Sequence, residues 1–376
     1  MQNVSQSILV HICCSVDSHH FLSELKKLYP TTKIIGYFYN PNIHPFEEYT
    51  LRLLDVERSC NLLDIELIDE EYDFNHWLVQ TKGYEDAPEK GERCEICFSV
   101  RLHKTAKKAK QLNLKFISTT LLTSPMKPQE ELFALGEKIS TQYNLGFISL
   151  DTRSSGGTQR QQALAKEAKL YRQNYCGCLY ALTKQRDKSS KQPTELFCPI
   201  SQKHYAEFPI PLRLALYKKR MELEQKQIPY RLIKQRKMFY YPQFTILYDQ
   251  FKNQLPCYVL THSLFPYCGN LDKMRSQKVD MIKLKNGIFC SLNSEVYMLS
   301  LEFYNHFFKR KDSSITELLF SGTSTEEELE CRNAIEGDRL GSSLILVVDS
   351  PQESRYSITH FAFFQEEILE RIVTEE

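Results

Sequence analysis

Residues 8–18 read Ile-Leu-Val-His-Ile-Cys-Cys-Ser-Val-Asp-Ser, and this stretch decides the fold. Its first three residues form a short apolar run, which predicts a buried strand. Ser18 and the apolar residues after it recur at helical spacing, which predicts the capped start of an amphipathic helix. Cys13 and Cys14 therefore fall in a turn between a strand and a helix. Open α/β sheets hold ligands at such turns, where backbone donors at the start of the next helix are free.

Two interpretations of this turn stay open at this point. Adjacent thiols at a strand end can offer two soft ligands to one metal centre, but Cys13 and Cys14 can equally be buried structural cysteines. Asp17 also has two explanations. Its hard carboxylate, one turn beyond the thiols, suits an additional iron with open coordination positions. An acid this early in a helix also interacts favourably with the helix dipole, which alone would explain it.

Composition narrows the class of protein. The 376 residues allow two domains or one large one, and the formal net charge of +1 indicates neither a polyanion-binding nor an acidic role. We expect no secretory signal at the N-terminus, and no apolar stretch reaches the length that a membrane span needs. The expectation is a soluble cytoplasmic protein. In that compartment, clusters among the 12 cysteines are more often metal-binding or redox-active than disulfide-bonded.

Strand and helix patterns alternate over the first half of the chain. This alternation predicts an α/β fold with a mostly parallel sheet and helices on both faces. The apolar runs that predict its strands are residues 8–10, 33–39, 65–68, 115–119 and 147–150. The polar groups that follow these strands are Cys13 and Cys14, residues 40–44, Thr119 and Thr120, and Asp151. Because the carboxyl ends of parallel strands meet at one edge, we expect these groups to converge on one rim.

A second thiol pair, Cys94-x-x-Cys97, comes at the predicted start of the helix 98–112. The helix dipole stabilises thiolates there, and the spacing lets both sulfurs reach one ion or cluster. With Cys13 and Cys14 this pair makes four thiolates, the complement of an iron-sulfur cluster or a structural zinc. Zinc usually takes two Cys-x-x-Cys pairs, and adjacent cysteines chelate a single tetrahedral ion poorly. The sequence therefore favours a cluster.

Cys176-Gly177-Cys178 is a third thiol pair of a different kind. A disulfide between residues two apart closes a small strained ring, and strained disulfides are easily reduced. Gly177 permits the unusual backbone that such a ring needs. The pattern favours a redox-active pair. Two reduced thiols on a surface loop, or two further metal ligands, are the alternatives.

The second half of the chain is patterned differently. Residues 183–194 carry almost no apolar side chain and predict a linker. Short apolar runs at residues 288–292 and 344–348 predict strands, so we expect domains at 1–186 and 187–376, the second a smaller α+β domain. Its cysteines show no ligand spacing and are interpreted as structural: Cys198, Cys257, Cys268, Cys290 and Cys331.

Charge is segregated in this second half. Residues 201–240 contain ten Lys and Arg against three Glu, whereas residues 312–376 contain fifteen Asp and Glu against four Arg. The basic segment could bind the phosphates of an RNA and stack its tyrosines on bases, or be an ordinary solvated face. The acidic tail could fold back on the basic segment or only keep the protein soluble.

Five motifs in residues 8–182 resemble the QueH-type epoxyqueuosine reductases. They are His-x-Cys-Cys at 11–14, Tyr-Asn-Pro-Asn-Ile-His-Pro at 39–45 with Glu48 and Tyr49, Glu-Lys-Gly-Glu-Arg-Cys-x-x-Cys-Phe at 89–98, Thr-Thr-Leu at 119–121 with Ser124 and Pro125, and Tyr-Arg-Gln-x-Tyr-Cys-Gly-Cys at 171–178. The resemblance implies a Rossmann-like domain of the adenine nucleotide alpha hydrolase-like type. It also implies an oxidoreductase that reduces the epoxide of epoxyqueuosine in tRNA to queuosine, the last step of queuosine biosynthesis.

The same resemblance implies a site. Its [4Fe-4S] cluster would be held by four residues: Cys13, Cys14, Cys94 and Cys97. Cys176 and Cys178 would form the redox-active disulfide. Many family members have a third cysteine where this chain has Asp17, which keeps the four thiolates but changes the ligands of any additional iron. The residues expected to bind substrate are Tyr39, Asn40, His44 and Arg172, and the expected partners are tRNA with epoxyqueuosine in its anticodon and an electron donor.

Two other classes of protein compete with this interpretation. A tRNA sulfurtransferase or ATP pyrophosphatase also uses a parallel sheet, but such enzymes have Ser-Gly-Gly-x-Asp-Ser after the first strand. Residues 13–18 keep only the last two positions of that pattern, and without its glycines the backbone amides cannot close on a pyrophosphate. The second rival is a non-catalytic RNA-binding protein stabilised by zinc, which would be colourless.

Overall fold

The computed structural model describes residues 7–263, 275–285 and 287–374. They form two compact units. Unit 1 runs to Pro193 and includes Tyr217–Ile228, and unit 2 comprises Thr194–Leu216 with the chain from Pro229 onward. Cys268 lies outside the described residues. Within them, no helix combines the length and the apolar composition that crossing a bilayer requires.

Unit 1 is built on a five-stranded sheet in which all strands run parallel. The strand order is β3-β2-β1-β4-β5, so β1 lies at the centre between β2 and β4. The strands are β1 (Ile8–Ile12), β2 (Ile34–Phe38), β3 (Glu66–Asp69), β4 (Phe116–Thr119) and β5 (Gly146–Phe147). The predicted parallel sheet is confirmed.

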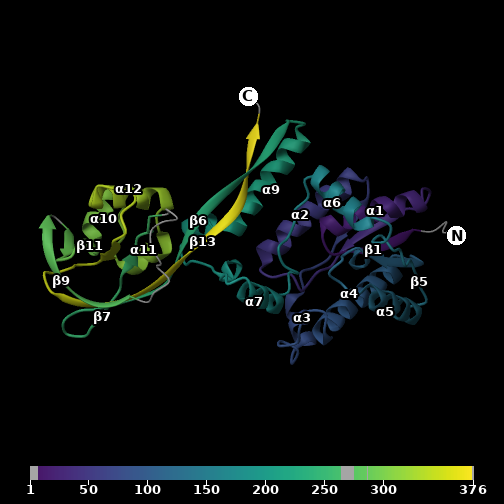
Figure 1. The fold of residues 1–376 in the computed structure, drawn as a ribbon, viewed down its shortest axis with the longest axis horizontal. Helices are drawn as coiled ribbons and strands as arrows, with labels where there is room; N and C mark the ends of the chain where they lie inside the picture. Colours follow the sequence, from purple (N-terminus) through teal and green to yellow (C-terminus); the bar gives the residue numbers. More distant parts are fainter. Residues whose placement is uncertain (1–6, 264–274, 286, 375–376) are drawn as a thin grey trace. The chain divides into compact units, whose positions relative to one another are not determined.

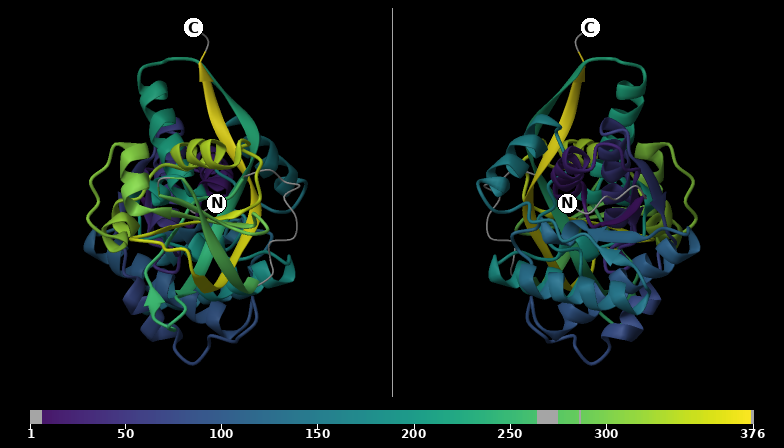
Figure 2. Two further views of the ribbon diagram at one scale, coloured as in Figure 1. Left: turned by 90° about the vertical axis from the view of Figure 1, so that its left-hand side faces the viewer. Right: turned by 90° about the vertical axis from the view of Figure 1, so that its right-hand side faces the viewer.

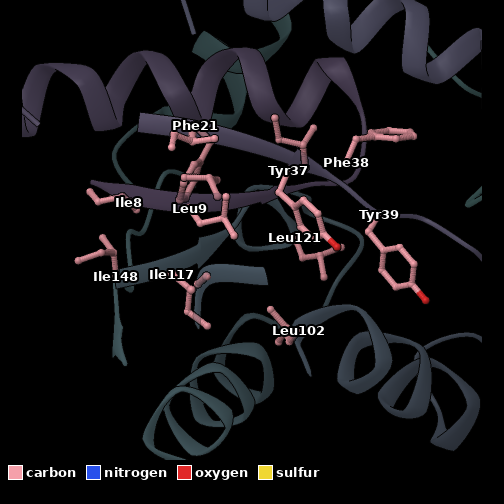
Figure 3. Packing of buried hydrophobic residues seen from close by; sticks show 14 of the residues in the cluster. Ile8, Leu9, Phe21, Tyr37, Phe38, Tyr39, Leu102, Ile117, Leu121 and Ile148 are labelled. Atoms are coloured by element: carbon pink, nitrogen blue, oxygen red, sulfur yellow. The ribbon is translucent and has the colours of Figure 1, made fainter. Parts of the chain in front are cut away.

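Helices cover both faces of this sheet (Figures 1 and 2). On one face α1 (Ser15–Leu28) packs with α2 (Phe46–Leu62) and α6 (Gly157–Glu167), and on the other α4 (Glu92–Gln111) packs with α3 (Phe74–Thr81) and α5 (Gln129–Gln142). β1 and β2 are buried over their full length, as expected of central strands covered on both faces. Figure 3 shows Leu9, Phe21 and Leu102 from strand and helix joining in this core.

Two local expectations are wrong. The first helix begins at Ser15, not Ser18, and its N-cap residue is Cys14 in an extended conformation. The backbone N–H of Ser18 already donates to the Cys14 carbonyl at 3.0 Å, so Ser18 lies inside the helix. α7 (Leu179–Lys188) extends into the predicted linker, because its first turn buries an apolar face and the polar residues that follow continue the helix.

Unit 2 is an α+β domain, as predicted. Its sheet has the order β7-β6-β13-β9-β10-β11-β12-β8. The strands are β6 (Tyr230–Tyr248), β7 (Gln254–Leu255), β8 (Tyr258–Val259), β9 (Arg275–Lys285), β10 (Ile288–Ser291), β11 (Val296–Ser300), β12 (Leu344–Val348) and β13 (Arg355–Thr374). Side chains of β12 alternate between two apolar clusters, and the second cluster includes α10 (Leu301–Phe308), α11 (Ile315–Ser321) and α12 (Thr325–Glu336). The short helices before the sheet are η2 (Thr194–Leu196) and α8 (Gln202–Ala206).

The acidic tail folds back on the basic segment within unit 2. β13 pairs antiparallel with β6 along almost the whole of both strands. Arg236 lies 3.7 Å from Glu366, and Arg213 lies 3.2 Å from Glu367. Arg213 is on the preceding helix, but Glu367 and Glu370 of β13 also lie opposite Lys237 and Lys234 of β6.

The basic helix α9 (Pro209–Gln225) also departs from the sequence expectation. Arg220, which the basic segment offered as a phosphate contact, is fully buried and donates to the Lys169 carbonyl at 2.9 Å. It therefore cannot reach a phosphate. Lys218 and Lys219 remain exposed.

We predict that Gly136→Ala destabilises unit 1 although alanine favours helices. Gly136 is buried in α5, and a methyl group there would overlap the ring of Phe147. Overpacking costs ~1–3 kcal/mol, whereas the gain in helix propensity is about 1 kcal/mol. We therefore expect a lower urea midpoint and a net loss of up to about 2 kcal/mol.

Phe147→Leu provides the matched background for this test. Removing the ring relieves the overlap, so Gly136→Ala should cost less in the Phe147→Leu protein than in the wild type. An unchanged or higher urea midpoint for Gly136→Ala alone would contradict the packing described here.

Candidate functional site

The turn after β1 is held from both neighbouring strands. The side-chain amide of Asn40 donates to the Ile12 carbonyl at 2.8 Å, and the Cys13 N–H donates to Thr120 Oγ1 at 3.1 Å. These bonds join the ends of β2 and β4, the latter followed by η1 (Thr120–Leu122), to the end of β1. The expected convergence of these strand ends on one rim is confirmed.

His11 connects the ends of β2 and β4 at the same rim through hydrogen bonds of its ring. Its ring is fully buried between Thr119 Oγ1 at 2.9 Å and the Tyr39 carbonyl at 3.1 Å. Burial, helped by the charge of Arg101, lowers the pKa of His11 to about 3. The ring is therefore neutral at physiological pH, and both nitrogens are engaged within the protein. His11 therefore has a structural role at this rim.

Cys13, Cys14 and Asp17 form one group of donors at this turn. Their ligand atoms all lie within 4.8 Å of one another. The two sulfurs are 3.9 Å apart, and Cys13 Sγ lies 3.3 Å from Asp17 Oδ2. The second carboxylate oxygen of Asp17 accepts a bond of 2.6 Å from Gln161 on α6, which fixes the orientation of the carboxylate.

This group is unfavourable to ionise without a cation. Burial raises the pKa of Asp17, and a hydrogen bond with Cys13 together with burial raises the pKa of Cys14 well above its ordinary value. Metal binding requires deprotonated ligands and replaces their protons. Two thiols and a carboxyl that repel one another when charged are therefore a donor set suited to a cation.

Cys94 and Cys97 lie in the first two turns of α4, which begins at Glu92, six residues before the predicted start. Cys94 is half-buried, and its sulfur accepts the Lys90 N–H at 3.3 Å. Cys97 is buried and packs with Cys178 against Trp77. Among the described residues, neither Cys94 nor Cys97 belongs to the close donor group of Cys13, Cys14 and Asp17.

The Cys176–Cys178 loop is pinned to the loop after β2. Arg52 donates to the Cys176 carbonyl at 3.1 Å, and the Gly177 carbonyl accepts the His44 N–H at 2.9 Å. Gly177 has φ +101°, and a Cβ there would lie 2.9 Å from Ile43. The loop therefore needs glycine. Cys176 and Cys178 are both free thiols in this structure, so the redox-active disulfide stays a prediction.

The two thiols of this loop differ sharply in acidity. Burial alone would raise the pKa of Cys176, but the charge and hydrogen bond of Lys127, with help from Arg101 and Arg52, lower it to about 7. Lys127 Nζ lies 3.1 Å from Cys176 Sγ. Burial and the charge of Cys176 raise the pKa of Cys178 to about 12. Cys176 is thus the thiolate and Cys178 the protonated partner.

The four residues expected to bind substrate have different surroundings. Asn40 is buried with both ends of its amide engaged, because Arg101 donates to its oxygen at 3.0 Å and its nitrogen holds β1. Tyr39 is also buried, and the Lys104 ammonium lies 5.2 Å from its ring. Their contact with substrate stays a prediction.

His44 and Arg172 lie nearer the edge of the site. The half-buried ring of His44 stacks on Phe74 with centroids 4.8 Å apart, and burial lowers its pKa. Arg172 is exposed and donates to the Gln162 carbonyl on α6 at 2.9 Å. Substrate binding by these two residues also stays a prediction.

Sequence analysis missed three buried or half-buried residues that shape the site: Lys127, Arg101 and Gln161. A signal for Lys127 was present, since it lies in the loop after β4 and therefore at the carboxyl end of a strand. Arg101 and Gln161 lie within α4 and α6, where nothing distinguishes them from ordinary helical polar residues.

We predict that Lys127→Met raises the pKa of Cys176 and slows its alkylation. At pH 7.5 a thiol of pKa about 7 is roughly three-quarters ionised, whereas an ordinary thiol near 8.5 is about one-tenth ionised. The alkylation rate of Cys176 in the metal-free protein should therefore fall by roughly tenfold or more, measured by peptide mass spectrometry across a pH series.

The exposed Cys198 in the same samples is the internal control, and Lys110→Met is the control substitution. Lys110→Met should not alter the alkylation rate of Cys176. Lys127→Met should not alter the alkylation rate of Cys198. An identical pH profile for Cys176 in Lys127→Met and wild type would show that the ammonium does not stabilise this thiolate.

Known proteins of one family are similar to this chain in sequence. The family model described as epoxyqueuosine reductase QueH matches residues 8–184. Epoxyqueuosine reductase QueH of Helicobacter pylori (strain ATCC 700392 / 26695) is 34% identical over 370 residues, which cover 96% of this chain and 98% of that protein. The QueH protein of Thermotoga maritima is 34% identical over 188 residues, covering 49% of this chain and 95% of its own length.

Among solved structures, the U34-tRNA thiolase NcsA from Methanococcus maripaludis with its [4Fe-4S] cluster is 15% identical, with a TM-score of 0.34, and the match covers 58% of this chain and 73% of NcsA. The sequence matches are far closer. Since the alignment with the Helicobacter pylori protein spans nearly the whole of both chains, this chain belongs to the QueH family of epoxyqueuosine reductases.

Proposed function

We propose that this protein reduces the epoxide on the cyclopentane ring of epoxyqueuosine in tRNA to the alkene of queuosine. Membership of the QueH family makes it an oxidoreductase of queuosine biosynthesis. The observation that carries the detailed proposal is the group of Cys13, Cys14 and Asp17 at the carboxyl end of β1. The two thiols are soft donors and the carboxylate is a hard donor. The same unit contains the acidic thiol Cys176.

Cys13, Cys14, Cys94 and Cys97 are the residues that would hold a [4Fe-4S] cluster. Cys13 and Cys14 lie in the turn before α1, Cys94 and Cys97 lie in the first two turns of α4, and thiolates are the usual ligands of such clusters. Each thiolate of a cluster binds a different iron, so the four need not lie within the spacing of single-ion ligands. The Lys90 N–H at 3.3 Å from Cys94 Sγ is a hydrogen bond that would stabilise a thiolate ligand.

Asp17 would provide an oxygen ligand for an additional iron. Gln161 holds one carboxylate oxygen at 2.6 Å and leaves the other beside Cys13, so the carboxylate is oriented before any metal arrives. Such oriented ligands are typical of metal sites. When bound, the cluster would supply electrons and an iron with an open position would polarise the C–O bond.

The thiols of this chain balance the reaction. Removing the epoxide oxygen as water takes two electrons and two protons, and oxidising Cys176 and Cys178 to a disulfide releases the same number of each. Lys127 and the Cys176 sulfur hold one proton between them, while Cys178 holds the other as a thiol. An external two-electron reductant must then reopen the disulfide after each turnover.

We predict that two cysteine variants distinguish loss of the cluster from loss of turnover. Wild-type protein reconstituted anaerobically with iron and sulfide should contain at least about four irons per chain, absorb broadly in the visible and convert epoxyqueuosine in tRNA to queuosine. Cys94→Ser should lose the cluster and the activity. Cys176→Ser should keep the absorbance and lose the activity, measured by mass spectrometry of nucleosides from digested tRNA.

Cys60→Ser is the matched control, because Cys60 is another thiol of unit 1 and lies outside the close donor group of Cys13, Cys14 and Asp17. It should retain both cluster and turnover. Full turnover by a Cys14→Ser protein that lacks any cluster would overturn the proposed function.

We also predict that Asp17→Asn removes only the additional iron. The amide keeps the shape of the side chain and loses the charge that favours a cation. The molar ratio of iron to sulfide should fall from about 5:4 toward 1:1. The visible absorbance of the [4Fe-4S] cluster should be retained. A ratio that is the same in wild type and Asp17→Asn would exclude Asp17 as a ligand.

A further inference from the structure

A groove of about 930 Å³ lies on unit 1 between α3, α4 and α5. These three helices share one side of the sheet in Figure 1. The volume lies at the upper end of the ~300–1,000 Å³ typical of small-molecule pockets, so the groove has room for more than one ring system. Half-buried Ile96, Val100 and Leu135 give it an apolar floor.

Cationic side chains also line the groove. Lys107 on α4 and Lys138 on α5 are exposed, and within the described part of the chain neither forms an ion pair. Burial, and then the charges of Lys107 and Lys138, lower the pKa of His103, which also lines the groove. Glu95 and Glu131 also line the groove and moderate its positive field.

The inner end of the groove adjoins the thiol site. Tyr39, at the end of β2, and Phe98, next to Cys97, both line it. The Lys127 ammonium lies 5.5 Å from the Phe98 ring and 3.1 Å from Cys176 Sγ. A base that reaches Cys176 would therefore bring the adjoining nucleotides of its strand to this groove.

We propose that this groove binds the single-stranded nucleotides that flank the reactive base of tRNA, with Lys104, Lys107 and Lys138 contacting their phosphates. The inference rests on the proposed function, since it takes tRNA as the substrate. Single-stranded RNA is recognised by basic grooves whose apolar surfaces accept unstacked bases. β6 is a poorer candidate, because Glu366 pairs with its Arg236, and Glu367 and Glu370 lie opposite its Lys237 and Lys234.

The test is the salt dependence of tRNA binding by Lys107→Ala/Lys138→Ala. The probe is tRNA carrying epoxyqueuosine, and its Kd is measured over a series of salt concentrations. Each lost phosphate contact lowers the slope of log K against log salt by about 0.7–0.9. The double variant should therefore lose roughly 1.5 units of slope and bind roughly tenfold or more weakly at about 0.1 M salt.

Lys110→Ala/Lys115→Ala is the matched control. It removes two exposed lysines from unit 1, one of them on α4, that do not line the groove. The control should bind tRNA with the slope of the wild type. Because all four lysines are exposed, neither double variant should unfold, and equal thermal midpoints check this.

Two outcomes would overturn the groove as an RNA site. One is that the slope of log K against log salt falls equally in both double variants, or falls in neither. The other is unchanged tRNA binding with slower turnover only when the reductant is a protein, which would assign the groove to an electron-transfer partner. Failure of the proposed function is a separate result, namely wild-type protein that binds tRNA but leaves its epoxyqueuosine unreduced.

Discussion

The site depends on two hydrogen bonds to the backbone at the end of β1. Asn40 holds the Ile12 carbonyl at 2.8 Å, and Thr120 holds the Cys13 N–H at 3.1 Å. A turn at the edge of a sheet would otherwise satisfy these groups with water. Fixed from both neighbouring strands, the turn presents Cys13 and Asp17 on the same side, 3.3 Å apart. Adjacent cysteines thus become a donor group through the strand order of the sheet.

The second constraint is the balance of buried charge around Cys176. Lys127 is half-buried, and a buried ammonium needs a partner to stay charged. The Cys176 thiolate at 3.1 Å is that partner, and Cys94 adds to the effect, so together they raise the pKa of Lys127 against its burial. The same pairing lowers the pKa of Cys176 to about 7. One interaction therefore keeps a cation in the interior and sets which thiol of the loop is ionised.

Sequence patterns predicted the parallel sheet and its rim because the alternation of strands with helices, and the polar residues at strand ends, can be seen in local periodicity. They misplaced the start of α1, since Ser18 is a good capping residue but Cys14 has the extended backbone that a cap needs. They missed Lys127, whose partner is 49 residues away in the chain. They also counted Arg220 as a surface cation, although it is buried against Lys169. These errors concern contacts that only the folded chain creates.

The part of the chain that matches the QueH family model, residues 8–184, lies within unit 1. The QueH protein of Thermotoga maritima aligns over 95% of its length with only 49% of this chain, so a protein of about half this size carries the same family name. In unit 2, Cys331 is buried in an apolar cluster, Cys290 is buried in β10, and Cys198 is exposed. None of these joins a close donor group among the described residues. Because acidic residues of β13 pair with Arg236 and lie opposite Lys234 and Lys237 of β6, the lysines of unit 1 become the stronger candidates for contacting RNA phosphates.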